Sequence, residues 1–255
     1  MTTPLAIHTQ GLRKTFGDLV AVDGIDLSVP RGSFYGFLGP NGAGKSTTIK
    51  CLTGLLRPTA GAFRILDIDP LTDPVAVKRK VGVVPEDLAL FDRLTGAETL
   101  AFVGQVHGLP SNMIRSRTKE LFELMDLSRA AGDLVADYSH GMRKKVALAA
   151  ALLPAPRLLF LDEPFEGVDA IASRQIKDLL GEFVKGGGTV FLTSHILEIV
   201  ERLCDHIGII RRGKLVAEGP IAELRGEGGR TLEERFLEII GADRPAATAL
   251  DWLGG

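Results

Sequence analysis

Cysteine and long apolar runs are scarce in this chain of 255 residues, and each scarcity excludes a class of protein. The two cysteines, Cys51 and Cys204, lie within apolar patterns, which predicts reduced, buried thiols in a cytosolic setting rather than a disulfide scaffold. The longest apolar run, 146–156, contains two prolines and is shorter than the ~18 residues of a membrane span. Residues 1–4 lack the basic and apolar regions of a signal peptide, so none is expected.

Excess charge is also lacking, because 30 basic and 32 acidic residues leave a net charge of −2. A balance this close to zero does not favour nucleic acid, and no nucleic-acid partner is expected. With 45% apolar and 24% charged residues the composition is that of an ordinary globular protein. The length suffices for one large domain or a domain with a subdomain.

A glycine-rich segment with a Lys-Ser pair lies between an expected buried strand, 34–38, and an expected helix, 48–52. Strand, glycine loop and helix in this order form a phosphate-binding loop, in which backbone N–H groups and the helix N-terminus attract anions. Lys45 can then reach the β- and γ-phosphates of a nucleotide, and the Ser46 hydroxyl can bind Mg²⁺. A turn that matches by chance is the alternative, which this setting disfavours. The loop comprises Gly39, Pro40, Asn41, Gly42, Ala43, Gly44, Lys45, Ser46 and Thr47.

A second candidate site follows the wholly apolar run 158–161, which is typical of a parallel strand buried on both faces. Open α/β sheets bind ligands at the carboxyl ends of such strands, and this one ends in Asp162-Glu163. Asp162 is a candidate for holding Mg²⁺ through water, and Glu163 for polarising an attacking water. Alone, these carboxylates could equally cap a loop; the phosphate-binding loop favours the functional interpretation.

The rest of the pattern is that of an α/β chain with a helical insert at about 87–157. Apolar and alternating runs predict strands at 7–12, 25–29, 34–38, 61–68, 81–84, 158–161, 189–193, 206–210 and 215–218. Helix caps and helical periodicity predict helices at 48–52, 75–80, 95–108, 112–126, 139–153, 171–185, 196–204 and 231–240. In the helix at 112–126, the expected inner stripe is Ile114, Leu121, Leu124 and Met125. The last 15 residues carry few signals, and a mobile tail is expected there.

Three more residues have a structural and a functional interpretation. Ser139 is the expected N-cap of a helix. His195 follows a strand, where a lone histidine is usually structural, yet at the sheet edge of Lys45 and Asp162 it could bond to a γ-phosphate. Spacing alone favours a core position for Phe16 over stacking on an adenine ring.

Taken in order, the phosphate-binding loop, Tyr138–Met142 and the strand ending in Asp162-Glu163 resemble the nucleotide-binding subunit of an ATP-binding cassette (ABC) transporter over roughly residues 5–220. The resemblance implies an α/β P-loop NTPase core with a mostly parallel sheet, an N-terminal antiparallel β subdomain and the helical insert. Residues 1–220 would form the ATPase domain, and 221–255 a short helical extension and tail. It further implies that Gly39–Thr47 and Leu158–Glu163 are the Walker motifs, that Phe16 stacks on adenine and that His195 is the switch histidine.

The resemblance also implies partners. The signature motif, matched by Ser139, His140, Gly141 and Met142, contacts the γ-phosphate held by the opposite subunit, so that two cassettes close over two ATP molecules. Asp169 matches the aspartate loop that crosses this dimer, which could be a homodimer or a heterodimer. Integral membrane permease subunits would dock beside Glu86 and 88–94, placing the chain in the cytoplasm at the inner face of the cell membrane. Leu88, Leu90 and Phe91 there could be an exposed apolar surface or insert core.

Three departures from the family pattern affect the expected activity. Glu86 replaces a glutamine; it can still accept bonds from Mg²⁺-bound water, but it adds negative charge beside the γ-phosphate. His140 and Met142 alter the signature Leu-Ser-Gly-Gly-Gln, and Glu166-Gly167-Val168-Asp169 alters Ser-Gly-Leu-Asp. These variants, with Leu94–Glu98 and Thr231–Leu237, resemble the exporter branch whose membrane subunits are separate chains.

The expected function is therefore an ATPase subunit, with ATP and Mg²⁺, that drives export through separate membrane subunits. One alternative is a soluble cassette ATPase that acts on ribosomes or DNA. The single cassette, the absence of sustained heptads and one short basic run, Arg143-Lys144-Lys145, disfavour it. Another is a degenerate cassette that binds ATP without hydrolysis, against which Lys45, Asp162, Glu163 and His195 are all present.

Overall fold

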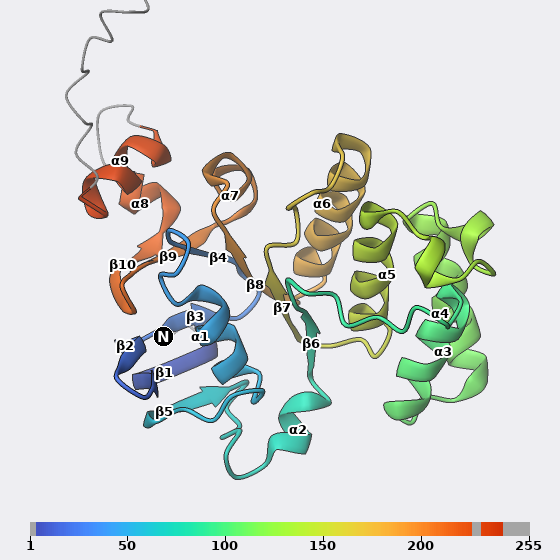
Figure 1. The fold of residues 1–255 in the computed structure, drawn as a ribbon, viewed down its shortest axis with the longest axis horizontal. Coiled ribbons are helices and arrows are strands. Elements are labelled where there is room, and N and C mark those ends of the chain that lie inside the picture. Colours follow the sequence, from blue (N-terminus) through green and yellow to red (C-terminus); the bar gives the residue numbers. More distant parts are fainter. Residues whose placement is uncertain (1–3, 226–230, 242–255) are drawn as a thin grey trace, which may run out of the picture.

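A computed structural model describes residues 4–225 and 231–241 of the chain (Figure 1). Its centre is a six-stranded sheet in the order β10-β9-β4-β8-β7-β6. All neighbouring strands are parallel except β10, which forms an antiparallel hairpin with β9. The strands are β4 (Phe34–Leu38), β6 (Val81–Val84), β7 (Leu158–Asp162), β8 (Thr189–Ser194), β9 (His206–Arg211) and β10 (Lys214–Pro220). The predicted mostly parallel sheet is confirmed.

Apolar residues on both faces explain why this sheet is buried. Successive side chains of a strand point to opposite faces. In β7, Leu158 and Phe160 therefore join the core on one side, and Leu159 and Leu161 join the core on the other. Phe191 of β8 packs on the first side, where its ring lies 5.7 Å from that of Phe160.

A smaller antiparallel sheet covers the first side of the central sheet. It contains β1 (Leu5–Phe16), β2 (Leu19–Ile25), β3 (Ser28–Pro30) and β5 (Ala60–Ile65), and β1 pairs with the other three. The helix α1 (Lys45–Leu52) shares this core through Ile49, Cys51 and Leu52. This sheet is the predicted N-terminal β subdomain.

The strand predicted at 25–29 is two strands. Ile25 pairs with Leu12 in β2, whereas Val29 pairs with Ile7 in β3. Between them the Asp26 carboxylate accepts a hydrogen bond from the Gly11 N–H at 2.6 Å, which turns the chain where an unbroken strand was expected. The alternation of apolar and polar residues does not reveal such a bend, because the alternation continues from one strand through the turn into the next.

The second side of the central sheet is covered by helices. α5 (His140–Leu152), α6 (Ala170–Lys185) and α7 (Leu197–Leu203) contribute to that core. α3 (Gly96–Val106) and α4 (Ser111–Leu124) lie beyond α5, at the end of the molecule remote from the small sheet (Figure 1). The shorter helices are α2 (Pro74–Lys78), α8 (Ile221–Arg225) and α9 (Leu232–Ile239), and 3₁₀ turns occupy Ser128–Ala130 and Val135–Asp137.

The predicted helices agree with the structure apart from details of packing. Both capping boxes are formed, at Thr95 with Glu98 and at Thr231 with Glu234. The expected inner stripe of α4 was wrong at Leu124, which is 57% exposed, because the helix turns Phe122 toward the core instead. No helix in the described ranges is long and apolar enough to cross a bilayer. The expected mobile tail falls mainly on 242–255, outside the described residues.

Candidate functional site

The carboxyl ends of the parallel strands bring the candidate residues to one edge of the sheet. Leu38, which precedes the glycine-rich loop, pairs with Ser194, next to His195. Asp162 pairs with Thr193 on the neighbouring strand. Segments more than 100 residues apart in sequence therefore meet in one place, as the predicted ligand-binding edge requires.

The glycine-rich loop has the close backbone contacts that only glycine permits. Gly44, at the N-cap of α1, has φ of 111°, and a Cβ there would lie 2.4 Å from the Ala21 carbonyl oxygen. A Cβ on Gly39 would lie 2.4 Å from the Ile210 carbonyl oxygen. The loop is thereby fixed against β2 and β9, and the first turn of α1 keeps N–H groups that a helix cannot satisfy internally. This cradle fits the phosphates of a nucleotide.

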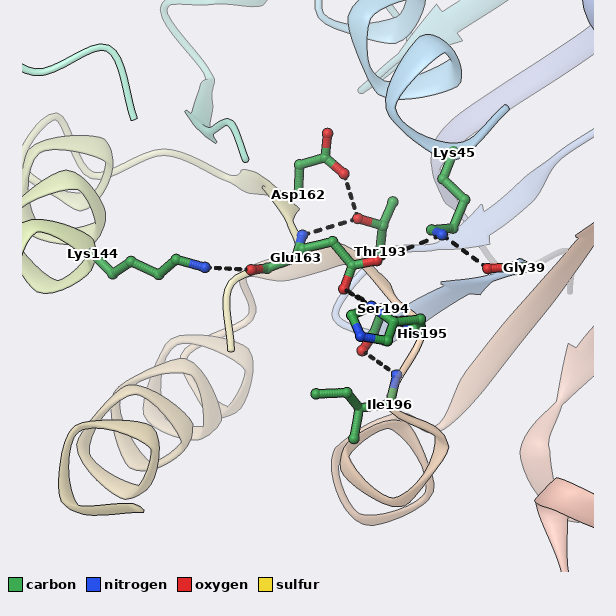
Figure 2. Close-up of polar contacts among 9 residues, drawn as sticks. All are labelled: Gly39, Lys45, Lys144, Asp162, Glu163, Thr193, Ser194, His195 and Ile196. Carbon is green, nitrogen blue, oxygen red and sulfur yellow. Dashed lines mark hydrogen bonds and ion pairs between the residues drawn. The ribbon is translucent and has the colours of Figure 1, made fainter. Parts of the chain in front are cut away.

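Lys45 is held over the loop. Its Nζ donates a hydrogen bond to the Gly39 carbonyl oxygen at 2.8 Å, and the side chain is 7% exposed. The same ammonium lies 3.5 Å from Glu163 Oε1 (Figure 2). A buried lysine between the loop and a carboxylate is placed to hold phosphate oxygens.

Glu163 lies at the centre of the site. Its other carboxylate oxygen, Oε2, is 3.0 Å from Nδ1 of His195 and accepts the His195 backbone N–H at 3.3 Å (Figure 2). The residue has a left-handed backbone with φ of 48°, a conformation that costs roughly 1–3 kcal/mol for a residue other than glycine. The structure thus brings Lys45, Glu163 and His195 together, as the sequence predicts.

Asp162 is oriented by Thr193, a residue without any motif signal. The Thr193 hydroxyl donates to Asp162 Oδ1 at 2.5 Å and accepts the Glu163 backbone N–H at 3.0 Å. The described residues contain no cluster of three or more His, Cys, Asp or Glu side chains that could hold a metal. The Asp162 carboxylate fits Mg²⁺ that is bound together with a nucleotide, because that ion keeps several waters and takes only one or two protein ligands besides the phosphates.

A cleft of about 690 Å³ is lined by the loop residues 41–47, Glu163 and His195, but not by Asp162, Gly39 or Pro40. Phe16 lies at the cleft and is 45% exposed, with the Lys14 ammonium 4.9 Å from its ring centre, so the core position that spacing favoured was wrong. Its flat, accessible ring is suited to stacking on a base. Glu86, an exposed residue after β6, also faces the cleft. Glu166 of the aspartate-loop motif also lines the cleft, and the lining residues without a motif signal are Leu19, Val20, Ala21, Arg212 and Gly213.

The signature residues do not line this cleft. Ser139 caps α5 as predicted, accepting the Met142 N–H at 3.3 Å. His140 places Nε2 3.3 Å from the Glu166 carbonyl oxygen, and a Cβ on Gly167 would lie 3.1 Å from its ring. Gly141 is buried, whereas Met142 packs partly against the core. His140 therefore ties the start of α5 to the loop after Glu163.

Asp169 is the N-cap of α6. Its Oδ1 accepts the N–H groups of Ile171 and Ala172, both at 2.9 Å. These bonds, chiefly the one from Ala172, lower the pKa of Asp169, so the carboxylate is ionised at neutral pH. A Cβ on Gly141 would lie 3.5 Å from Asp169 Oδ2, which shows that the signature segment and this loop are neighbours.

Comparison with known proteins places this arrangement among its relatives. Residues 22–166 match the family model described as ABC transporter. The daunorubicin/doxorubicin resistance ATP-binding protein DrrA of Streptomyces peucetius is 41% identical over 88% of this chain and 68% of its own length. The linearmycin resistance ATP-binding protein LnrL of Bacillus subtilis is 36% identical, over 89% and 73%. A solved ATP-binding subunit of an ABC transporter superposes with a TM-score of 0.86 at 31% identity, covering 92% of this chain and 99% of that one.

Proposed function

Because the chain belongs to the ABC transporter family as an ATP-binding, ATP-hydrolysing subunit, we propose that it powers export of an antibiotic-like small molecule through separate membrane subunits. The relatives named above for resistance to daunorubicin, doxorubicin and linearmycin support this class of cargo. The subunit would act in the cytoplasm at the inner face of the membrane. We further propose 1–220 as the ATPase domain, with 87–157 as its helical subdomain and 221–255 as an extension.

The observation that carries the proposed mechanism is the Glu163 carboxylate held between Lys45 and His195. Lys45 would bind the β- and γ-phosphates, and His195 the γ-phosphate. Glu163 would polarise a water whose oxygen attacks the γ-phosphorus, while the bond to the bridging oxygen of ADP breaks. Phe16 would stack on the adenine. The loop residues Gly39–Thr47 would enclose the phosphates.

Magnesium would be held by Ser46 directly and by Asp162 and Glu86 through water, and it would offset the charge of the β- and γ-phosphates. Asp162 is suited to this role because Thr193 occupies Oδ1, which fixes the direction of the other carboxylate oxygen. Glu86 brings a third carboxylate to a cleft that already contains Glu163 and Glu166. With Glu86 the positive groups of the site therefore have to balance one more negative charge than they would with a glutamine at this position.

Dimerisation would complete the nucleotide site. The N-terminus of α5, with Ser139 as its cap, lies outside the chain's own cleft, where it can present N–H groups to the γ-phosphate held by a second cassette. Asp169, beside Gly141, would cross the same interface. ATP would favour the closed pair, and hydrolysis would let the subunits part.

An apolar groove of about 720 Å³ between α3 and the segment after β6 is the proposed permease site. Phe91 and Phe102 are 55% and 44% exposed and pack edge to face with ring centres 5.3 Å apart. Leu88 and Leu90 are half-buried against the core, whereas Phe91 is exposed, so the core alternative fits the two leucines and the surface alternative fits Phe91. An exposed aromatic pair in a groove fits an apolar partner segment.

Substitution of the central carboxylate tests the mechanism. Glu163→Gln keeps the size of the side chain but removes its charge, so we expect ATP binding to persist, hydrolysis to fall by about 100-fold or more and a dimer to accumulate with ATP. Phosphate release, equilibrium nucleotide binding and size-exclusion chromatography measure these three properties. Turnover at the wild-type rate would rule out the proposed role of Glu163.

Affinity purification of the Glu163→Gln chain from gently solubilised membranes tests the partner. With ATP present we expect an integral membrane protein in defined ratio, and a wild-type sample with ADP is the control for dimer-dependent capture. Recovery of ribosomes or DNA-associated proteins without a membrane protein would instead favour a soluble cassette ATPase.

A further inference from the structure

Lys144 is a buried cation to which the proposed roles assign no task. It is 5% exposed, and its Nζ donates a hydrogen bond of 2.6 Å to the Glu163 main-chain carbonyl oxygen (Figure 2). Burial lowers the pKa of Lys144, while the carboxylates of Glu166, Glu163, Glu86 and Asp162 oppose that effect. Removing an ammonium group from water is costly unless hydrogen bonds and opposite charges compensate it. The bond to the Glu163 carbonyl oxygen and the surrounding carboxylates supply that compensation for Lys144.

The contact lies where the backbone needs support. Glu163 has the left-handed φ of 48°, and its N–H and carbonyl groups are both bonded to buried side chains. Thr193 accepts the N–H at 3.0 Å, and Lys144 donates to the carbonyl oxygen together with the more distant Glu166 N–H at 3.3 Å. The peptide groups on either side of the Glu163 Cα are thus fixed, which directs its side chain toward Lys45 and His195.

The position of Lys144 in the chain connects this support to another part of the molecule. Lys144 belongs to α5, whose N-cap Ser139 is five residues earlier, roughly 7.5 Å along the helix axis. The N-terminus of that helix is the surface proposed to meet the nucleotide of a second cassette. A displacement of α5 would therefore move the donor that holds the Glu163 backbone.

We infer that Lys144 is a positioning residue that sets Glu163 for hydrolysis and couples it to the nucleotide held against the N-terminus of α5. The bond is already formed in the single chain, so closure on the opposite ATP would act by holding α5, and with it Lys144, in the position that aligns Glu163. In a pair of cassettes this bond would be a physical route by which the filling of one site affects hydrolysis at the other. The inference rests on the proposed roles of Glu163 and of the signature segment.

The next residue provides a matched control. Lys145 is 8% exposed and its Nζ donates a hydrogen bond of 3.0 Å to a main-chain carbonyl oxygen, that of Met125. The two lysines thus share helix, burial and bonding chemistry. They differ in that only Lys144 bonds to Glu163, so their variants separate a positioning role from general stability.

The test compares Lys144→Met, Lys144→Arg, Lys145→Met and Glu163→Gln in the full chain. Readouts are kcat and KM for ATP, equilibrium ATP affinity, the dependence of rate on ATP concentration and Tm. For Lys144→Met we expect kcat to fall about 10- to 100-fold, because a small misplacement of a catalytic group has effects of this size. The ATP affinity should stay within about twofold of the wild-type value. The cooperative dependence of the rate on ATP concentration should be lost. Arginine, which keeps a donor, should restore much of the rate. Lys145→Met should lower Tm by about as much as Lys144→Met does, while its kcat stays within about threefold of the wild-type value.

The outcomes separate this inference from the proposed function. A kcat near wild type in Lys144→Met, while Glu163→Gln abolishes turnover, overturns the role of Lys144 and leaves that of Glu163 intact. An equal loss of kcat in Lys145→Met also overturns it, because the effect would then be one of stability. Normal turnover in Glu163→Gln would remove the proposed role of Glu163 itself.

Discussion

At the scale of residues, the alignment of the two carboxylates after β7 depends on one hydroxyl. Thr193 is fully buried, and it bonds both to the Asp162 carboxylate and to the Glu163 N–H. The hydroxyl donates to one of these groups and accepts from the other, across neighbouring strands. The orientation of the predicted Mg²⁺-binding and water-polarising residues is thus set by a residue that makes no contact with the cleft surface.

Thr193→Val should show the weight of this hydroxyl. Valine has nearly the same shape but leaves the buried Glu163 N–H without a partner, so we expect the free energy of unfolding to fall by about 1–3 kcal/mol. Hydrolysis should slow as well, since Asp162 loses its orientation. Urea denaturation and phosphate release measure the two effects. Thr193→Ser keeps the hydroxyl and should retain most of both; equal behaviour of the two variants would contradict this explanation.

At the scale of elements, two helices of the insert begin with comparable caps but have different surroundings. Thr95 and Glu98 form a capping box at the start of α3, and Ser139 caps α5 through the Met142 N–H. Both caps satisfy N–H groups that a helix leaves unpaired. Only the start of α5 adjoins the Asp169 loop, so only this cap is expected to take part in nucleotide contact.

Ser139→Ala and Thr95→Ala should therefore agree in stability and differ in activity. Each loses an N-cap, so each should be destabilised by about 1 kcal/mol in chemical denaturation. ATP-dependent dimerisation and hydrolysis should fall in Ser139→Ala and stay close to wild type in Thr95→Ala. If both variants lost activity equally, the start of α5 would have no special role.

At the scale of the whole molecule, nucleotide binding, dimerisation and permease docking are assigned to different surfaces. The exposed start of α5, residues 139–142, does not line the cleft that contains Lys45 and Glu163, which is why a second cassette is proposed. The groove beside Phe91 and Phe102 is a separate surface that contains none of the phosphate-binding residues. Nucleotide binding and permease docking can therefore be disturbed independently.

Phe102→Ser tests that independence. Removing the ring takes away exposed apolar area and its partner contact with Phe91, so recovery of the permease should fall several-fold in the affinity experiment. ATP binding by the isolated chain should be unchanged, since the groove lies outside the cleft. Val216→Ser changes a similarly exposed residue of β10 outside the groove and should leave recovery intact. Loss of ATP binding in Phe102→Ser would contradict the separation of the two surfaces.

The sequence by itself determined the features that depend on neighbours in the chain. The strand, glycine loop and helix around Lys45, the apolar strand ending in Asp162-Glu163, and the caps at Thr95, Ser139 and Thr231 were all confirmed as local structure. Such features are set by backbone propensities and by the periodicity of apolar residues. The order of the motifs also identified the family, and hence the mostly parallel core sheet with its N-terminal antiparallel β subdomain, while helical periodicity predicted the helical insert.

Only the tertiary structure decided which distant residues complete the site. Thr193 and Lys144 bond to Glu163 across 30 and 19 residues of sequence, and neither spacing has a local periodicity that would reveal it. Packing also placed Phe16 at the cleft rather than in the core, turned Leu124 to solvent and broke the strand predicted at 25–29. Burial and hydrogen-bond partners follow from how strands and helices assemble, and the spacing of apolar residues along the chain does not contain that information.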